Sequence, residues 1–172
     1  LRHREKKRWN VLDMGCGSAI LALAAIRARP ATMVMAADND PIAVRTAAEN
    51  RKVNAIARAR MRTIFSNGFL ARPVRRAAPY DLIFANILAG PLCRMAADLV
   101  SAVSPRGWII LSGILNEQAD VVEARFAQHG ARRVARLVID EWTTLVMRPA
   151  RLGLSRGVWQ GRNNYRWAVE AD

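Results

Sequence analysis

A glycine-rich turn and a later acidic residue are the parts of this sequence whose types and spacing most clearly suit chemistry. The run VLDMGCGSA holds Gly15 and Gly17 between an apolar strand pattern and a helix pattern. Glycines at such a turn let a ligand approach the backbone and the N-terminus of the helix. Asp38 follows Gly17 by 21 residues, at the end of the next apolar run, where a carboxylate can accept both hydroxyls of a ribose. The pattern predicts a nucleoside site.

The residues around the turn discriminate between two kinds of nucleoside cofactor. A dinucleotide-binding turn carries a third glycine three residues after the second, for close helix-to-strand packing, and this sequence has Ile20 there. Asp13 precedes the turn and is a poor neighbour for a pyrophosphate, whereas S-adenosylmethionine has no phosphate and carries a sulfonium and an ammonium. We therefore predict S-adenosylmethionine as the cofactor. For Asp13 alone, an ordinary acid near a helix start is an equal alternative.

Two further strand patterns are followed by polar residues that could contact the cofactor or the substrate. After the fourth strand pattern comes the segment ANIL, and the amide of Asn86 can orient a substrate amine by accepting its N–H bonds. The run SNGF at residues 66–69 is placed to contact adenine, with a plain turn as an equal alternative. The expected cofactor-binding residues are Asp13, Gly15, Cys16, Gly17, Asp38, Asn39, Asn67, Gly68 and Asn86, and the expected catalytic residues are Asn86, Ile87 and Leu88.

Other reactive side chains form no recognisable constellation in the sequence. Cys16 and Cys93 lack metal-type spacing, and Cys16 is expected to be a small buried residue rather than a nucleophile. His129, beside Gly130, is typical of a cation at a helix C-terminus. The sequence predicts no metal site.

The elements that must position these residues alternate between strand and helix. Strands are expected over residues 10–14, 33–37, 60–65, 80–85, 108–112, 133–139 and 142–147. Helices are expected over residues 18–29, 41–53, 91–103 and 116–129, with Asp40 as an N-cap and a turn at residues 104–107. This alternation predicts an α/β fold with a mostly parallel, doubly wound sheet, closed by a C-terminal antiparallel hairpin.

Length and charge bound the remaining possibilities. The 172 residues fit one domain, which we expect at residues 10–149, between a basic leader or linker remnant at 1–9 and a tail at 150–172. The net charge of +13 favours RNA, ribosomal or other acidic partners, although a compositional bias toward arginine is an equal explanation. Residues 51–76 carry eight basic residues and no acid. We expect these charges to form a solvated face rather than an RNA-binding groove. No run is long enough to span a bilayer, and we expect a cytoplasmic monomer.

Five segments together resemble the ribosomal protein L11 methyltransferases: VLDMGCGSAILALAAI, AADNDPIAVRTAAENRKVN, YDLIFANILAGPL, WIILSGILNEQADVV and EWTTLVMRP. The resemblance covers about residues 10–149, and Gly15, Asp38 and Asn86 match cofactor-contacting positions of that family. Ala19 stands where the family usually has glycine; because alanine is small, the turn can survive there if the backbone needs no positive φ. The family's N-terminal recognition domain is absent from this sequence, so we expect the chain to be a piece of something longer.

The resemblance implies a Rossmann-like fold and N-methylation of a ribosomal protein, at lysine and N-terminal amines, with S-adenosylmethionine as donor and ribosomal protein L11 as partner. We expect direct transfer to a neutral amine, without a metal. The alternatives are an RNA or small-molecule N-methyltransferase on the same scaffold, and a truncated, non-catalytic cofactor-binding remnant.

Overall fold

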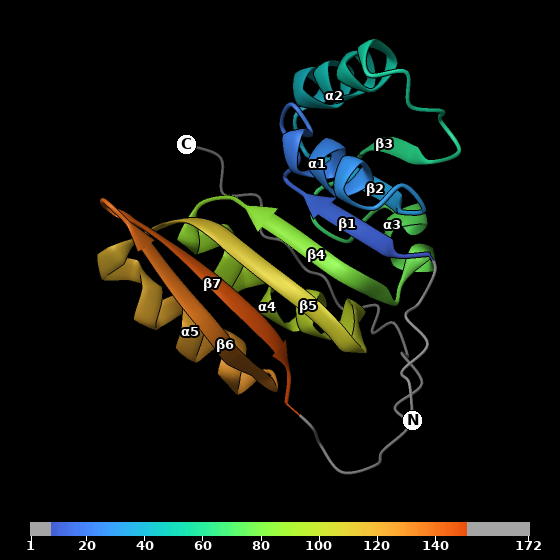
Figure 1. Cartoon of the computed structure of the whole chain (residues 1–172). Coiled ribbons are helices and arrows are strands. Elements are labelled where there is room, and N and C mark those ends of the chain that lie inside the picture. The colour runs from blue at the N-terminus through green and yellow to red at the C-terminus, as the bar shows by residue number, and fades with distance from the viewer. Residues whose placement is uncertain (1–7, 151–172) are drawn as a thin grey trace.

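The structure, a computed structural model, describes residues 8–150. It consists of a single seven-stranded sheet with helices on both faces (Figure 1), which confirms the predicted Rossmann-like α/β architecture. The predicted tail, apart from Ala150, and the predicted leader, apart from Arg8 and Trp9, lie outside the described residues.

The chain alternates between the two kinds of element through most of its length. The strands are β1 (Asn10–Met14), β2 (Met33–Asp38), β3 (Met61–Phe65), β4 (Tyr80–Asn86), β5 (Val103–Leu115), β6 (Ala131–Ile139) and β7 (Trp142–Pro149). The helices are α1 (Ile20–Ala28), α2 (Pro41–Val53), α3 (Arg72–Ala77), α4 (Ala89–Ala102) and α5 (Ala119–Gln128), with a short 3₁₀ turn, η1 (Asn116–Gln118), before α5.

In the strand order β3-β2-β1-β4-β5-β7-β6, the order in which strands are added to the sheet reverses between β1 and β4. The first five strands run parallel, and β7 pairs antiparallel with both β5 and β6. The predicted closing hairpin is therefore confirmed. In open sheets of this kind, ligands bind beyond the carboxyl ends of the strands at the reversal, which here means the ends of β1, β2 and β4.

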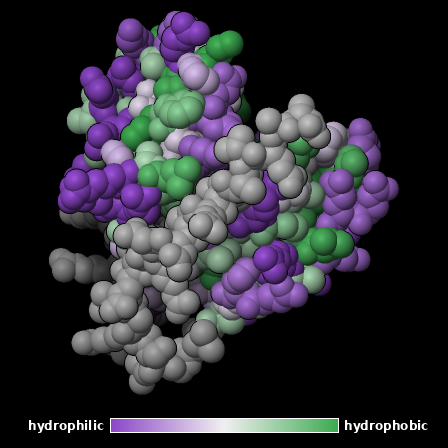
Figure 2. Space-filling view, turned by 180° about the vertical axis from the view of Figure 1, so that it is seen from behind, coloured by the Kyte–Doolittle hydropathy of each residue, from purple (hydrophilic) through white to green (hydrophobic). Residues whose placement is uncertain are grey.

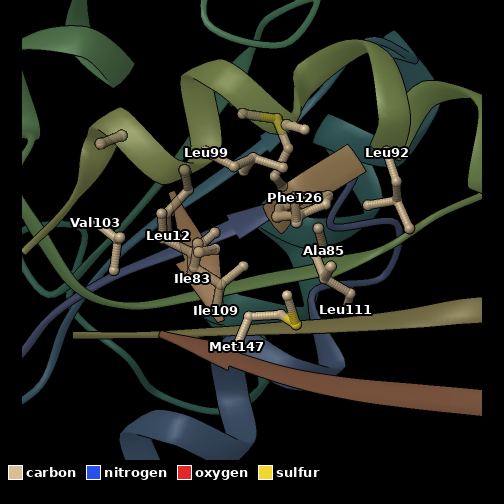
Figure 3. Packing of buried hydrophobic residues seen from close by; sticks show 14 of the residues in the cluster. Leu12, Ile83, Ala85, Leu92, Leu99, Val103, Ile109, Leu111, Phe126 and Met147 are labelled. Atoms are coloured by element: carbon tan, nitrogen blue, oxygen red, sulfur yellow. The ribbon is translucent and has the colours of Figure 1, made fainter. Parts of the chain in front are cut away.

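Hydrophobic cores on both sides of the sheet hold these strand ends in place. One core lies between the sheet and helices α3, α4 and α5, and contains Leu12, Ile83, Leu99 and Phe126, all fully buried. Figure 3 shows these side chains interdigitating with those of β5 and β7. The other core lies under α1 and α2. Strands β1 and β2 are buried along almost their whole length, because a central parallel strand is covered on both faces.

The structure corrects the expected element boundaries at three places. Helix α3 was not predicted, because its six residues carry little periodicity. The predicted turn at residues 104–107 lies within β5 as an irregularity, since Tyr80 pairs with Val103 but Leu82 pairs with Trp108. Helix α1 begins at Ile20 rather than Ser18, because Ala19 has a left-handed backbone conformation.

Candidate functional site

A pocket of about 500 Å³ opens at the carboxyl edge of the sheet, beside the ends of β1, β2 and β4. Its floor comes from these strand ends, one wall from the loop between β3 and α3, and the opposite wall from α4. The lining residues are Met14, Gly15, Asp38, Asn39, Ser66, Asn67, Gly68, Phe69, Leu70, Ile87, Leu88, Pro91, Arg94, Met95 and Asp98. Seven of the predicted site residues are among them: Gly15, Asp38, Asn39, Asn67, Gly68, Ile87 and Leu88.

The glycine-rich turn is held against both neighbouring strand ends. The backbone N–H groups of Gly15 and Cys16 donate to the carbonyl oxygen of Ala37, at 2.8 and 3.1 Å. Gly15 has a φ of +69°, and a Cβ at this position would lie 2.2 Å from Cγ2 of Ile87. Only glycine combines that φ with such a close approach. The turn after β1 and the segment after β4 are therefore in contact through Gly15.

Asp38 lies at the end of β2 with its side chain at the edge of the pocket. One carboxylate oxygen accepts the backbone N–H of Gly17 at 2.9 Å, and the other accepts that of Asp40 at 2.9 Å. Each oxygen keeps a further lone pair after accepting one N–H bond. The residue is 8% exposed, so the carboxylate is fixed in orientation and still borders the cavity.

Hydrogen bonds of Ser66 hold the conformation of the loop between β3 and α3. Its N–H donates to the carbonyl oxygen of Asp38 at 2.8 Å, and its hydroxyl donates to that of Gly68 at 2.6 Å and accepts from Ala71 at 3.1 Å. A Cβ on Gly68 would lie 3.0 Å from Sδ of Met95, on α4. The loop that contains Asn67 is thus fastened to β2 on one side and rests on α4 on the other.

Asn86 is the last residue of β4, and its exposed side chain lies over the backbone of β5. A Cβ on Gly113 would come within 2.8 Å of Oδ1 of Asn86 and 3.1 Å of the carbonyl oxygen of Ile87. Gly113 has a φ of +75°. A glycine here therefore makes room for the amide and fixes where it lies, next to the pocket-lining residues Ile87 and Leu88.

Four predicted site residues are not among the residues that line the pocket: Asp13, Cys16, Gly17 and Asn86. Asp13 is 1% exposed and points toward α1, where one carboxylate oxygen accepts the N–H of Ala22 at 3.0 Å. Burial is the largest cause that raises the pKa of Asp13 to about 7; the bond from Ala22 lowers it, and the charge of Asp38 raises it. Cys16 is packed in the core beneath α1, as predicted. Its burial, and next the charges of Asp13 and Asp38, raise the pKa of its thiol to about 12.

Asp13 should make the stability of the fold fall as the pH rises. Its folded-state pKa of about 7 exceeds the ordinary value of 3.8, so the folded state holds a proton that the unfolded state releases between these two values. The contribution of Asp13 to the free energy of unfolding should therefore decrease from about pH 4 to about pH 7 and stay constant above that. Asp13→Asn keeps an acceptor for Ala22 but cannot ionise. Urea unfolding of both proteins should show the variant gaining stability over the wild type across that range; parallel curves would contradict this.

The structure also decides the consequence of alanine at position 19. Ala19 has a φ of 62° and is fully buried, so the turn does need a positive φ at this position. Left-handed backbone costs about 1–2 kcal/mol for a residue other than glycine.

Ala19→Gly should therefore raise the free energy of unfolding slightly. Relief of the left-handed conformation is worth about 1–2 kcal/mol, and loss of a buried methyl group costs about 0.8 kcal/mol. Ala22→Gly is the matched control, because Ala22 is equally buried but lies inside α1, where glycine destabilises a helix. Thermal unfolding should give opposite signs for the two variants. Destabilisation by both would mean that the strain at Ala19 is negligible.

The α4 wall is the part of the pocket that the sequence-based predictions missed. Pro91, Arg94, Met95 and Asp98 face the cavity, and their spacing is that of one helix face. The signal was present, since this face mixes charged and apolar residues directly after the candidate segment at Asn86. Among residues 8–150, no cluster of His, Cys, Asp or Glu could hold a metal ion, and no helix there is long and apolar enough to cross a membrane.

Known proteins resemble this chain in both sequence and fold. A family described as "Ribosomal protein L11 methyltransferase (PrmA)" matches residues 1–150. Proteins named ribosomal protein L11 methyltransferase are 41% identical over 139 residues in Bradyrhizobium diazoefficiens and 40% identical over 144 residues in Caulobacter sp.. These alignments cover 81% and 84% of this chain but 46% and 49% of the relatives. The chain thus spans about half the length of the curated relatives it matches.

Solved structures agree with the sequence matches. The crystal structure of ribosomal protein L11 methylase from Lactobacillus delbrueckii subsp. bulgaricus superposes with a TM-score of 0.73 at 28% identity, over 87% of this chain and 73% of that one. A putative tRNA (m1A22) methyltransferase from Streptococcus pneumoniae superposes with a TM-score of 0.68 at 18% identity, over 89% of this chain and 69% of that one, which speaks for the fold alone. The predicted family and the S-adenosylmethionine cofactor are confirmed. The chain belongs to the ribosomal protein L11 methyltransferase family.

Proposed function

We propose that this chain transfers methyl groups from S-adenosylmethionine to amine nitrogens of ribosomal protein L11, at lysine side chains and at the N-terminus. The observation that carries the proposal is the contact between the glycine-rich turn and the segment after β4. Gly15 and Ile87 meet so closely that a Cβ on Gly15 would overlap Ile87. This contact brings the expected cofactor-binding and amine-facing residues to the same end of the pocket.

The pocket residues suit the parts of S-adenosylmethionine. The carboxylate of Asp38 keeps lone pairs for two ribose hydroxyls, while its bonds from Gly17 and Asp40 hold it still. The loop at Asn67 and Gly68 offers an amide and backbone groups for adenine. The missing Cβ of Gly15 lets Ile87 pack directly against the turn at the floor of the pocket. A carbon bound to a sulfonium is already activated toward displacement, so the cofactor supplies the chemistry and the protein supplies orientation.

Asn86 is assigned the role of holding the target amine. Its amide oxygen and neighbouring backbone carbonyls can accept N–H bonds, so that the nitrogen lone pair points into the pocket. Ile87 and Leu88 border the same end of the cavity and would exclude water there. A lysine amine has a pKa near 10.4 and is mostly protonated at neutral pH. The rate should therefore rise with pH as the neutral amine becomes more abundant.

The proposal is tested by supplying methyl-labelled S-adenosylmethionine with ribosomal protein L11 and ribosomal RNA in one reaction. Label should enter the protein only. Acetylation of all L11 amines beforehand should abolish incorporation. Label in the RNA, or in the acetylated protein, would show that the proposed acceptor is wrong.

Asp38→Ala should weaken binding of S-adenosylhomocysteine, measured by calorimetry, by about 1–3 kcal/mol, the range for hydrogen bonds to a charged group. NAD serves as the specificity control and should not bind. Asp40→Ala is the matched control, because Asp40 caps α2 by accepting the N–H of Ile42 at 2.7 Å and does not line the pocket. Equal losses for both variants would contradict the ribose assignment.

A further inference from the structure

A basic surface lies at the amino edge of β1, β2 and β3, on the side of the sheet opposite to the pocket. It is formed where helices α1, α2 and α3 end and where these strands begin. Its members are Arg8, Arg27, Arg29, Arg51, Lys52, Arg58, Arg60 and Arg76. Figure 2 shows hydrophilic side chains gathered over the part of the molecule that contains α2, β3 and α3. We call this set the amino-edge surface.

Side-chain and backbone contacts join the segments that carry this surface into one region. The guanidinium of Arg8 lies 2.8 Å from the sulfur of Met33, at the start of β2. The N–H of Val34, the next residue, donates to the carbonyl oxygen of Arg60 at 2.8 Å. Arg27 donates to the side chain of Asn54 at 2.5 Å. The starts of β2 and β3 and the ends of α1 and α2 are therefore adjacent.

Two further contacts complete the region around β1. The guanidinium of Arg29 lies over the ring of Trp9, at 4.8 Å from its centroid. The side chain of Asn10 donates to the carbonyl oxygen of Ala77 at 2.5 Å, which places Arg76 and the end of α3 beside the start of β1. The surface thus extends across three strands.

Positive charge dominates this edge. The segment from Arg51 to Arg76 contains eight basic residues and no acid, and five of the eight belong to this surface. Asp81 stands near the start of β4, where it accepts the N–H of Asn10 at 2.8 Å. Five of the basic side chains of the surface are exposed, at Arg8, Arg27, Lys52, Arg58 and Arg76.

Stabilisation of helix ends explains only part of this charge. Basic residues in the last turn of a helix interact favourably with its dipole, which accounts for Arg27, Arg51 and Lys52. Arg8, Arg58 and Arg60 lie outside helices, and a helix dipole gives no reason for them. A surface that collects such residues beyond the needs of the helices suits an external polyanion.

We propose that the amino-edge surface binds the phosphate backbone of RNA, while the pocket at the opposite edge remains free for cofactor and substrate. Arginine predominates in the surface, and its planar guanidinium suits phosphate oxygens in pairs. RNA is chosen over DNA because the proposed acceptor is a ribosomal protein, and this choice rests on the proposed function. RNA serves here as a docking partner and not as a methyl acceptor.

The test is fluorescence anisotropy of a labelled RNA hairpin with the full chain over a series of salt concentrations. For the wild type, the logarithm of the association constant should fall linearly with the logarithm of salt concentration. Lys52→Gln combined with Arg58→Gln should weaken binding at low salt and reduce the magnitude of the slope by about 2, because each lost phosphate contact contributes about 1.

A matched control removes the same charge elsewhere. Arg45 lies in the first half of α2 and Arg72 is the first residue of α3, so both are nearer the carboxyl edge, and both are exposed. Arg45→Gln combined with Arg72→Gln should reduce the magnitude of the slope by less than 1. Circular dichroism melting of the two double variants should show that both fold. If the two reduce the slope equally, binding follows net charge and the proposal is overturned.

Three further measurements locate and identify the partner without any methyl-transfer readout. S-adenosylhomocysteine should bind equally well with and without saturating RNA, because the two sites lie at opposite edges of the sheet; displacement by RNA would overturn the location. The RNA hairpin should bind at least as tightly as a DNA hairpin of the same sequence. Polyglutamate of matched charge should compete poorly. Tighter binding of DNA, or equal competition by polyglutamate, would overturn the choice of RNA. Methylation of L11 can fail while these results hold, so the two proposals are separable.

Discussion

Gly15→Ala is expected to lower the affinity for S-adenosylhomocysteine by about a hundredfold, or roughly 3 kcal/mol. Two costs combine in this variant. A left-handed φ of +69° is unfavourable for alanine, by about 1–2 kcal/mol. The added Cβ would also lie 2.2 Å from Cγ2 of Ile87, so the turn and the segment after β4 must separate. Overpacking of this kind costs about 1–3 kcal/mol.

The neighbouring glycine supplies a matched control for this prediction. Gly17 also has a positive φ, of +52°, but a Cβ there would meet nothing within 4 Å. Gly17→Ala should therefore show the backbone cost alone, and a smaller loss of affinity. Ile87→Ala should partly restore binding in the Gly15→Ala background, because it removes the overlapping methyl group. Calorimetry on the four proteins measures all of these effects, and equal losses for the two glycine variants would rule out the steric explanation.

Asn86→Ala is expected to reduce turnover on ribosomal protein L11 by about a hundredfold, the scale on which misplacement of a reacting group acts. KM for S-adenosylmethionine should change much less, because Asp38 and the β3–α3 loop, to which the ribose and adenine are assigned, are unaltered in this variant. An amide does not titrate in this range, so the pH dependence of the rate should keep its shape. A shifted pH profile would instead indicate proton transfer through this residue.

Gly113→Ala tests the same assignment without altering Asn86. The new Cβ would lie 2.8 Å from the amide oxygen of Asn86 and 3.3 Å from the backbone nitrogen of Ile87, so it must displace the amide. Turnover should fall as in Asn86→Ala, and Gly113→Ala should add little to a chain that already carries Asn86→Ala. Gly90→Ala provides the control, because a Cβ there would have only an ordinary contact of 3.6 Å with the side chain of Arg94. Full additivity of the two losses would disprove positioning of Asn86 by Gly113.

Several parts of the fold could be predicted because their signals are local. Asp40 followed by Pro41 predicted the start of α2, and its carboxylate accepts the N–H of Ile42. The apolar runs of β1 and β2 predicted buried central strands, since only a strand covered on both faces is apolar throughout. The pair Asp140-Glu141 predicted the β6–β7 hairpin, where Asp140 adopts a φ of 52°. Each of these features depends on a few neighbouring residues.

The sequence by itself also determined the family, and it pointed to the residues proposed for the site. The glycine-rich turn, Asp38 at a strand end and the segment at Asn86 can be identified by their spacing alone. Parallel strands end at the same edge of a sheet, so residues that follow three strand patterns were expected to converge. Gly15, Asp38 and Ile87 do border one pocket.

Only the tertiary structure decided which side chains face the pocket. Asp13 lies near the end of β1, just before Gly15, but its side chain points under α1 toward Ala22. Arg94 and Asp98 reach the pocket because α4 packs across the loop that contains Gly68. Ala19 adopts a positive φ that its own side chain disfavours, because the surrounding turn and core fix the backbone there. Such outcomes depend on contacts between segments far apart in the chain, and no local pattern records them.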